Sequence, residues 1–327
     1  QMNIPKLRQQ KTIKKCHGVS WEDNYAWIHQ ENILEVLKDP TKLNSEVRQY
    51  LEKNNEYTEH HLKDTKEFQK KLFEEIKGRI KLDDESLPYT DKKYIYWTKT
   101  TKKTNYAIKL RRKIGSNEIE EYWSGEKERK KLNAEYFGIG DLEVSNNDEM
   151  LAYSLDLKGS EYFTIYVRKI SDNKIISDEI HETSGSVTWS LDDKYIFYSK
   201  LDEHHRPRKI YRHQIGTKTK DDQLIYEEKD EGFTCAISMS SDEKYFFIST
   251  SDHTTSEIYF FDVNDLSPKP KLFRKRQKEI RYSVDSWKEN FFIHTNLDAE
   301  DFKICICKHG DINNWQDYIP ATKGVLI

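Results

Sequence analysis

The sequence has little of several features that would mark particular classes of protein. It contains 12 glycines and 7 prolines in 327 residues, which excludes a collagen-like or low-complexity chain. No run approaches the roughly 18 apolar residues of a membrane-spanning helix, and basic residues interrupt the start of the chain, where a secretory signal would be apolar. The cysteines are too few and too scattered for a disulfide framework, so we expect a protein of the reducing cytoplasm with no membrane partner. They are Cys16, Cys235, Cys305 and Cys307.

The chain also lacks an excess of positive charge. Its 54 Lys and Arg stand against 57 Asp and Glu, which gives a formal net charge of −3 and argues against a nucleic-acid partner. The basic run at residues 269–281 lacks the regular aromatics that stack on bases, so we interpret it as a solvated loop and strand face. Aromatic residues, by contrast, make up 13% of the chain, which indicates a folded core.

Residues 1–80 are predicted to form a helical segment. Apolar and other residues step by three and four between Ser45 and Leu62, and Asp64 with Glu67 is typical of a capping box at the start of a second helix. Two such helices are too small to bury their apolar faces on each other alone, so we expect this segment to dock on another domain. The first face contains Val47, Tyr50, Leu51, Asn54, Thr58, His61 and Leu62, and the second Phe68, Leu72, Phe73, Ile76 and Ile80.

Residues 81–327 change to a period of two and repeat themselves. Five segments share a turn, a charged residue and an aromatic-rich strand that ends in Ser or Thr, and their last residues are 56, 45, 50 and 46 apart. These segments are residues 91–98, 148–154, 193–199, 242–249 and 288–295. A second strand follows each, marked by Ile108, Ile165, Ile210, Ile258 and Ile304. A third marker follows four of the first strands, at Asp156, Asp202, Asp252 and Asp298.

This period predicts the fold class. A step of 40 to 50 residues with several strands per unit is typical of a β-propeller blade, whereas a β-sandwich gives no reason for a repeat at that length. Residues 314–319 are expected to form an outer strand, and residues 324–327 the opening strand of a further blade. The sequence therefore predicts a mainly β protein: an incomplete propeller of the seven-bladed type, with about five blades present, preceded by the α-helical N-terminal segment.

Motifs of catalysis and cofactor binding are missing. The chain has no G-x-S-x-G elbow, no phosphate-binding glycine loop and no H-E-x-x-H, so we expect no catalytic residue and no cofactor in it. Cys305, Cys307 and His309 alternate along a strand in the manner of metal ligands, but no fourth ligand is nearby and no metal is expected. We interpret them as ordinary strand residues, with Phe302, Ile304 and Ile306 facing the core on the opposite side.

Several segments resemble the oligopeptidase B group of the prolyl oligopeptidase family of serine peptidases. The resemblance runs over nearly the whole chain, and one departure is Asn24, where the family usually has proline. It rests on His17-Gly18, Trp21-Glu22-Asp23-Asn24-Tyr25-Ala26-Trp27, Tyr50-Leu51-Glu52, Asn55-Glu56-Tyr57-Thr58, Glu74-Glu75-Ile76-Lys77-Gly78-Arg79-Ile80, Asp84-Glu85-Ser86-Leu87-Pro88, Leu201-Asp202-Glu203-His204-His205-Arg206-Pro207, Tyr211-Arg212-His213, Ile215-Gly216-Thr217 and Thr254-Thr255-Ser256-Glu257.

The resemblance implies a propeller paired with an α/β-hydrolase domain that is split in sequence. The helical segment would pack on that C-terminal catalytic domain, which would carry the Ser, Asp and His triad and would be absent from this chain. The whole enzyme would cleave short basic peptides after Arg or Lys, and the propeller would control their access. This chain alone is then expected to be inactive.

The polar turn at residues 201–207 is the densest polar cluster of the repeats. A solvated turn is one interpretation; a contact with substrate or with the catalytic domain is the other. On the second interpretation Glu203, His205 and Arg206 lie at the substrate tunnel or the interdomain face. Two alternatives for the whole chain stay open: an inactive fragment of a decayed or split peptidase gene, and a stand-alone propeller that acts as an interaction scaffold.

Overall fold

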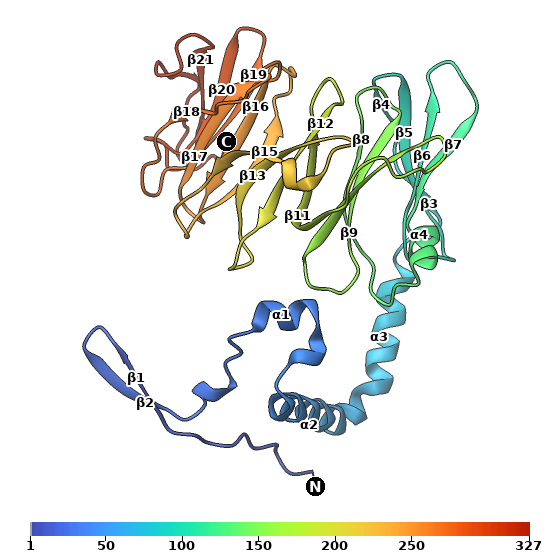
Figure 1. Ribbon diagram of the computed structural model, residues 1–327, viewed down its shortest axis with the longest axis vertical. Coiled ribbons are helices and arrows are strands. Elements are labelled where there is room, and N and C mark those ends of the chain that lie inside the picture. The colour runs from blue at the N-terminus through green and yellow to red at the C-terminus, as the bar shows by residue number, and fades with distance from the viewer. Residues whose placement is uncertain (1) are drawn as a thin grey trace. The chain divides into compact units, whose positions relative to one another are not determined.

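The computed structural model describes residues 2–327, so Gln1, the first residue of the segment 1–80, lies outside the described part. The chain forms two compact units, each considered by itself. The first comprises the residues up to Leu87 together with Thr98–Ile108, and the second comprises Pro88–Trp97 together with Lys109–Ile327. The first unit holds the long helices and the second holds most of the strands, as Figure 1 shows.

The first unit begins with a hairpin that the sequence analysis did not predict. Strands β1 (Thr12–Cys16) and β2 (Val19–Asp23) pair antiparallel, and the two turn residues His17 and Gly18 have positive φ angles of 48° and 77°. Such angles suit a two-residue hairpin turn. Short helical pieces follow: η1 (Ala26–Ile28), α1 (Ile33–Lys38) and η2 (Pro40–Lys42).

The two predicted helices are confirmed as α2 (Ser45–Leu62) and α3 (Lys66–Gly78), joined by η3 (Lys63–Thr65). The Asn44 side chain caps α2 by accepting hydrogen bonds from two backbone N–H groups. The predicted capping box at Asp64 is wrong: Thr65 precedes α3 and makes no side-chain cap, because η3 already continues the helical path. Neither helix buries a residue, and Phe68 and Phe73 of the predicted stripe are 65% and 60% exposed.

The remaining strands are antiparallel and form four sheets. The first has the order β3-β5-β6-β7 with β4 also paired to β5, the second joins β8 to β14, and the others are β15-β16-β17-β18 and β19-β20-β21-β22. Their bounds are β3 (Asp84–Glu85), β4 (Tyr89–Asp91), β5 (Tyr94–Thr100), β6 (Ile108–Lys113), β7 (Ile119–Ser124), β8 (Gly138–Val144), β9 (Met150–Asp156), β10 (Phe163–Lys169), β11 (Ile180–Trp189), β12 (Tyr195–Leu201), β13 (Pro207–Gln214), β14 (Gln223–Glu227), β15 (Thr234–Met239), β16 (Tyr245–Ser251), β17 (Ser256–Asp262), β18 (Lys271–Arg274), β19 (Tyr282–Trp287), β20 (Asn290–Thr295), β21 (Lys303–Lys308) and β22 (Gln316–Ile319); α4 (Gly125–Leu132) and η4 (Thr219–Asp221) lie between them.

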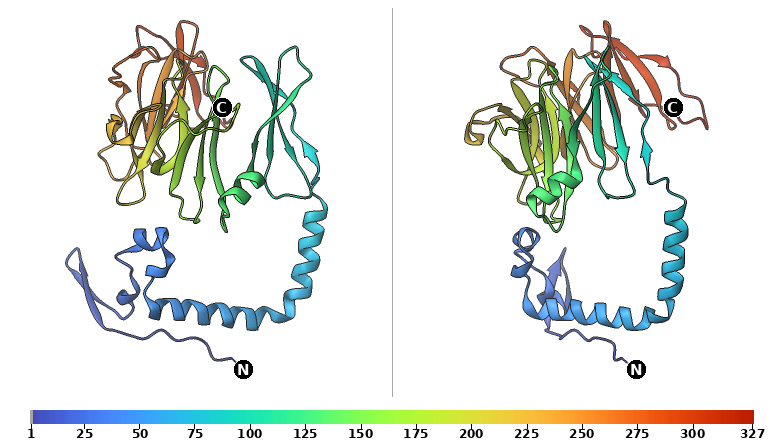
Figure 2. Two further views of the ribbon diagram at one scale, coloured as in Figure 1. Left: turned by 45° about the vertical axis from the view of Figure 1, so that its right-hand side comes forward. Right: turned by 90° about the vertical axis from the view of Figure 1, so that its right-hand side faces the viewer.

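The long strand β11 divides the seven-stranded sheet into two blades. Ile180 and Thr183 pair with β10, whereas residues 187–189 pair with β12; Thr183, at the junction, also pairs with Lys200 of β12. Gly185 lies between the two halves with a φ of +93°, and a Cβ there would come within 2.9 Å of the Phe163 ring, so only glycine fits this bend. We name the blades I (β4–β7), II (β8–β10 with the first half of β11), III (the second half of β11 with β12–β14), IV (β15–β18) and V (β19–β22). They follow one another in chain order in Figure 2, consistent with a propeller of about five blades.

The repeated sequence markers build the turns. Ser190 Oγ donates to Asp192 and accepts from the Tyr195 N–H, and Ser240 does the same with Asp242 and Tyr245 in the next blade. The marker aspartates after the first strands hold the following hairpins, because their carboxylates accept backbone N–H groups two to five residues ahead. Three of the four predicted positions do so: Asp156, Asp202 and Asp252.

Cys305 and Cys307 face the core, which corrects the predicted orientation of β21. They are 2% and 5% exposed within a cluster of phenylalanines, whereas Ile304 and Ile306 are only half-buried. Burial raises the pKa of the Cys307 thiol to about 11, so this thiol is protonated at neutral pH. Phe302 does not share a strand face with them, because it lies in the preceding turn with a φ of +67°.

The last residues follow the prediction only in part. The expected outer strand is confirmed as β22, but residues 324–327 form no strand. Thr322 instead makes an isolated bridge with Val325, and the Gly324 N–H donates to the Asp301 carboxylate. The local turn at Gly324, with a φ of +77°, replaces the extended backbone that the sequence suggested.

Candidate functional site

The turn between β12 and β13 carries the three predicted site residues. Asp202 organises it: Oδ1 accepts the N–H groups of His204 and Arg206, and Oδ2 accepts from Arg208 Nε at 2.5 Å. The burial of Asp202 acts to raise its pKa, but these hydrogen bonds outweigh it and lower the pKa below its usual value. The turn is therefore held by an ionised carboxylate.

The three side chains differ in what they are free to contact. Glu203 is exposed, with its carboxylate 3.9 Å from Arg208, and Arg206 is exposed as well. His205 is half-buried: its Nε2 lies 3.1 Å from the Ser160 carbonyl oxygen, and its ring meets the Tyr162 ring edge-on at 4.4 Å. His205 thus joins the turns of blades III and II, while Glu203 and Arg206 can reach a partner. Their role at a tunnel or interdomain face stays a prediction.

An acidic group that was not predicted from the sequence lies on β4 and β8, the opening strands of blades I and II. It comprises Asp91 at the end of β4 and Asp141 and Glu143 on β8. Burial among surrounding atoms, followed by the negative charges of Asp141 and Asp91, raises the pKa of Glu143 from its usual 4.5 to about 7, although the side chain still reaches solvent. Only proximity in the fold reveals this group, because Asp91 lies 50 residues before Asp141 in the sequence.

The Glu143→Gln variant should be more stable than the parent at neutral pH. Because the folded pKa is raised, the unfolded chain ionises first, and stability falls as the pH rises from about 4.5 to about 7. After discounting for solvent screening, we expect a gain of about 1 kcal/mol at pH 8 that vanishes below pH 4. Urea unfolding of the variant and the parent at both pH values measures this difference in the free energy of unfolding. Glu149→Gln, on the neighbouring exposed turn, is the control, and an equal gain in both variants would contradict the assignment.

The interpretation of residues 269–281 as a solvated run is wrong at Arg276, which forms ion pairs with buried glutamates. Its Nη2 lies 2.5 Å from Glu228 Oε2 and 3.0 Å from Glu257 Oε1, and both glutamates are 4% exposed. Arg274 stacks on Trp315 at 4.4 Å, so a second basic residue of the run is also engaged. The run therefore contributes to the internal structure of blades III to V.

An ion pair joins two blades that are not consecutive. Lys92, in the first turn of blade I, places Nζ 2.7 Å from Glu243 Oε1, in the first turn of blade IV. Both residues have positive φ angles, 49° and 58°, at the tips of their turns. Since the chain order of the blades separates I from IV by two others, this contact crosses between opposite sides of the arrangement.

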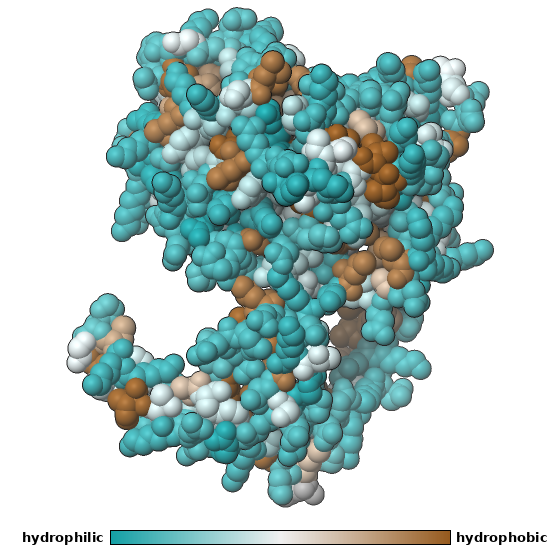
Figure 3. Space-filling view, viewed as in Figure 1, coloured by the Kyte–Doolittle hydropathy of each residue, from teal (hydrophilic) through white to brown (hydrophobic). Residues whose placement is uncertain are grey.

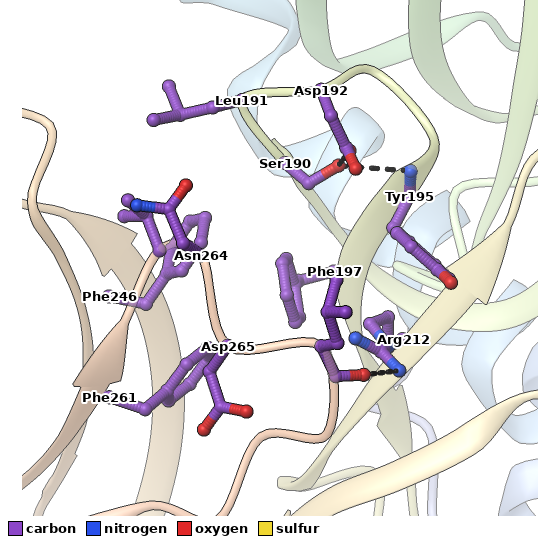
Figure 4. A pocket seen from close by; sticks show the side chains of 12 residues that line it. Ser190, Leu191, Asp192, Tyr195, Phe197, Arg212, Phe246, Phe261, Asn264 and Asp265 are labelled. Atoms are coloured by element: carbon purple, nitrogen blue, oxygen red, sulfur yellow. Dashed lines mark hydrogen bonds between the residues drawn. The ribbon is translucent and has the colours of Figure 1, made fainter.

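A small cavity of about 100 Å³ lies between blades III and IV, as Figure 4 shows. Phe197, Phe246 and Phe261 form its apolar wall, and Arg212 stacks on Tyr195 at 4.2 Å at its rim. Arg212 also donates to the Leu266 carbonyl oxygen, so the guanidinium is already engaged. The cavity is too small for most organic ligands.

No group of three His, Cys, Asp or Glu residues within residues 2–327 is placed to hold a metal ion. No helix in that range is long and apolar enough to cross a membrane.

The family is decided by a match over almost the whole chain. The family model for the "Prolyl oligopeptidase, N-terminal beta-propeller domain" matches residues 5–327. The chain belongs to the prolyl oligopeptidase family. It is 28% identical over 319 residues to Protease 2 of Moraxella lacunata, covering 96% of this chain and 45% of that protein. It is also 28% identical over 337 residues to dipeptidyl aminopeptidase BI of Pseudoxanthomonas mexicana, with the same two coverages.

Solved structures of the prolyl oligopeptidase family share the fold. Oligopeptidase B from Leishmania major superposes with a TM-score of 0.89 at 23% identity, covering all of this chain and 47% of that one. Oligopeptidase B from Trypanosoma brucei gives a TM-score of 0.86 at 22% identity over 98% of this chain and 47% of that one. The chain thus spans about half the length of these relatives and corresponds to their N-terminal propeller part.

Proposed function

We propose that this chain is the propeller portion of an oligopeptidase B-like serine peptidase and acts together with an α/β-hydrolase domain. One observation carries the proposal: α2 and α3 bury no residue, yet α3 presents Phe68, Leu72, Phe73 and Ile76 on one side, all at least 43% exposed. Figure 3 shows apolar side chains at the surface of this part. An apolar helix face of this size requires a partner surface.

The propeller's proposed task is to control which peptides reach the hydrolase domain. In a propeller the sheets surround a central channel, and the opening strand of each blade, such as β4 or β15, lies nearest to it. The Lys92–Glu243 ion pair supports the proposal, because it links opposite blades at the turns that follow these opening strands. Folded proteins would be excluded, and short peptides would enter when the two domains move apart.

Cleavage after Arg or Lys is the proposed specificity. The acidic group at Asp91, Asp141 and Glu143 would attract cationic peptides to the opening strands β4 and β8. This attraction would raise the local concentration of a basic substrate. Glu203, on its exposed turn, would add a further negative charge at the interdomain face or tunnel.

The test combines the chain with an α/β-hydrolase portion of the same family, taken from its own gene where one is encoded there and otherwise from an oligopeptidase B relative. We expect a stable complex that cleaves an Arg-Arg fluorogenic peptide, and at least tenfold weaker association for Phe73→Glu, because a charge would enter the apolar interface. Lys70→Glu on the same helix is the matched control. The absence of a G-x-S-x-G-containing frame after Ile327 would favour the scaffold alternative, and an inactive mixture would favour the decayed gene.

The same assay examines the predicted turn. Glu203→Lys should lower the cleavage rate of basic peptides while leaving association intact. Unchanged kinetics would remove Glu203 from the substrate path without affecting the docking proposal.

A further inference from the structure

Three side chains outside the predicted site form a hydrogen-bonded relay between blades II and III. Ser177 Oγ lies 2.6 Å from His213 Nε2, and His213 Nδ1 lies 2.6 Å from Asp222 Oδ1. Ser177 comes from the loop between β10 and β11, His213 from β13, and Asp222 from the residue before β14. A serine, a histidine and an aspartate linked in this order are the arrangement that activates a serine for acyl transfer.

The neighbouring groups show which atoms of the three side chains donate hydrogen bonds and which accept them. The second oxygen of Asp222 accepts the Tyr198 hydroxyl at 2.6 Å, so both carboxylate oxygens are acceptors. His213 therefore donates from Nδ1, and in the neutral imidazole Nε2 is the atom that accepts from the Ser177 hydroxyl. His213 is completely buried and the Asp222 side chain is 3% exposed, whereas Ser177 is only half-buried. The serine residue is therefore partly open to solvent, whereas the imidazole behind it is not.

A backbone donor lies beside the serine oxygen. The Gly216 N–H is directed at Ser177 Oγ over 3.4 Å, from a turn in which Gly216 has a φ of +86°. On the same loop Asp178 is held by Lys218 at 3.0 Å and by the Thr219 N–H, which ties the serine segment to the turn after β13. Ser177, His213 and the adjacent Gly216 N–H are thus held in place by contacts between blades II and III.

We propose that Ser177 is an activated nucleophile that accepts acyl groups from small carboxylic esters, independently of the peptidase function. His213 Nε2 takes the Ser177 proton while Oγ forms a bond to the ester carbonyl carbon; the ester C–O bond then breaks, and the imidazolium returns the proton to the leaving alcohol. Water attacks the acyl-serine in the second half-reaction, releases the carboxylic acid and restores the hydroxyl.

The experiment uses a fluorophosphonate probe on the 327-residue chain, which has no G-x-S-x-G serine to compete. We expect one adduct per chain, mapped to Ser177 by peptide mass spectrometry, and a burst of about one equivalent of p-nitrophenolate from p-nitrophenyl acetate. Ser177→Ala should lose both signals, whereas Ser186→Ala, which replaces an exposed serine of β11, should keep them. Loss of the buried base in His213→Gln should slow labelling by about 10²-fold or more.

A second variant covers the case in which His213→Gln fails to fold. Ser177→Cys, combined with Cys16→Ser, leaves the histidine in place and should react with iodoacetamide at least tenfold faster at neutral pH than exposed Cys16 of the parent chain, because the base generates the thiolate. Absence of an adduct at Ser177, or a cysteine at 177 no more reactive than Cys16, would overturn the proposal and leave the relay as a structural contact.

Discussion

Replacement of Arg276 by methionine should lower the free energy of unfolding by about 3–5 kcal/mol, because it leaves buried carboxylates without their cation. Arg276 is the cation shared by Glu228 after β14 and Glu257 of β17. The two glutamates also accept hydrogen bonds from Thr250 and from the Arg276 N–H, but these neutral donors do not balance two negative charges. Methionine keeps most of the side-chain volume, so the loss reports charge rather than packing.

The deficit of Arg276→Met should shrink in acid. Burial acts to raise the pKa of Glu228, but hydrogen bonds from Thr250, the Asp230 N–H and Arg276 outweigh it and lower the pKa below its usual 4.5. In the parent chain this carboxylate therefore stabilises the fold above about pH 4.5, and the contribution is lost as the pH falls through the lowered folded pKa. Without Arg276 the pKa of Glu228 rises, so the variant regains stability relative to the parent when Glu228 becomes protonated.

Urea unfolding at pH 7 and pH 4 measures both effects. Arg274→Met is the control, since Arg274 stacks on Trp315 and should cost no more than about 1 kcal/mol. A difference of less than 1 kcal/mol between Arg276→Met and the parent at pH 7 would show that the network does not depend on this cation.

The blades could be predicted because their sequence signals are local. Each first strand has a period of two, and its turn is built by neighbours, such as Ser190 with Asp192 and Tyr195, whose hydrogen bonds span five residues or fewer. The orientation of β21 could not be predicted in this way, because Ile304 and Cys305 are both compatible with a core. The packing of Phe291, on the adjacent strand β20, and of Phe273, on β18 of the neighbouring blade, decides which of the two is buried.

The sites required the tertiary structure for a similar reason. Ser177 lies 36 residues before His213, and only the pairing of β13 with β14 brings His213 to Asp222. The sequence signal for a nucleophilic serine is a G-x-S-x-G turn, and Ser177 has no such context. The apolar stripe of α3, in contrast, was visible from spacing alone because it depends only on the helical period.

The largest packing effect is expected at Phe291, the centre of the contact between blades IV and V. Its side chain is fully buried, and its ring centroid lies 5.0 Å from that of Tyr245, 5.1 Å from Phe273 and 5.6 Å from Phe260. Phe291→Ala should lower the free energy of unfolding by about 3–5 kcal/mol, because the cavity removes these ring contacts as well as the transfer free energy of the phenyl group.

Phe292 gives the matched comparison, because it is the next residue of β20 and points to the other face. It is half-buried and makes an edge-on contact with Tyr318 at 5.3 Å, so Phe292→Ala should cost about 1–2 kcal/mol. Thermal and urea unfolding of both variants measure the difference. Equal losses would mean that blades IV and V do not depend on one ring at their interface, whereas a large loss confined to Phe291→Ala would identify the aromatic cluster as the contact that holds these two blades together.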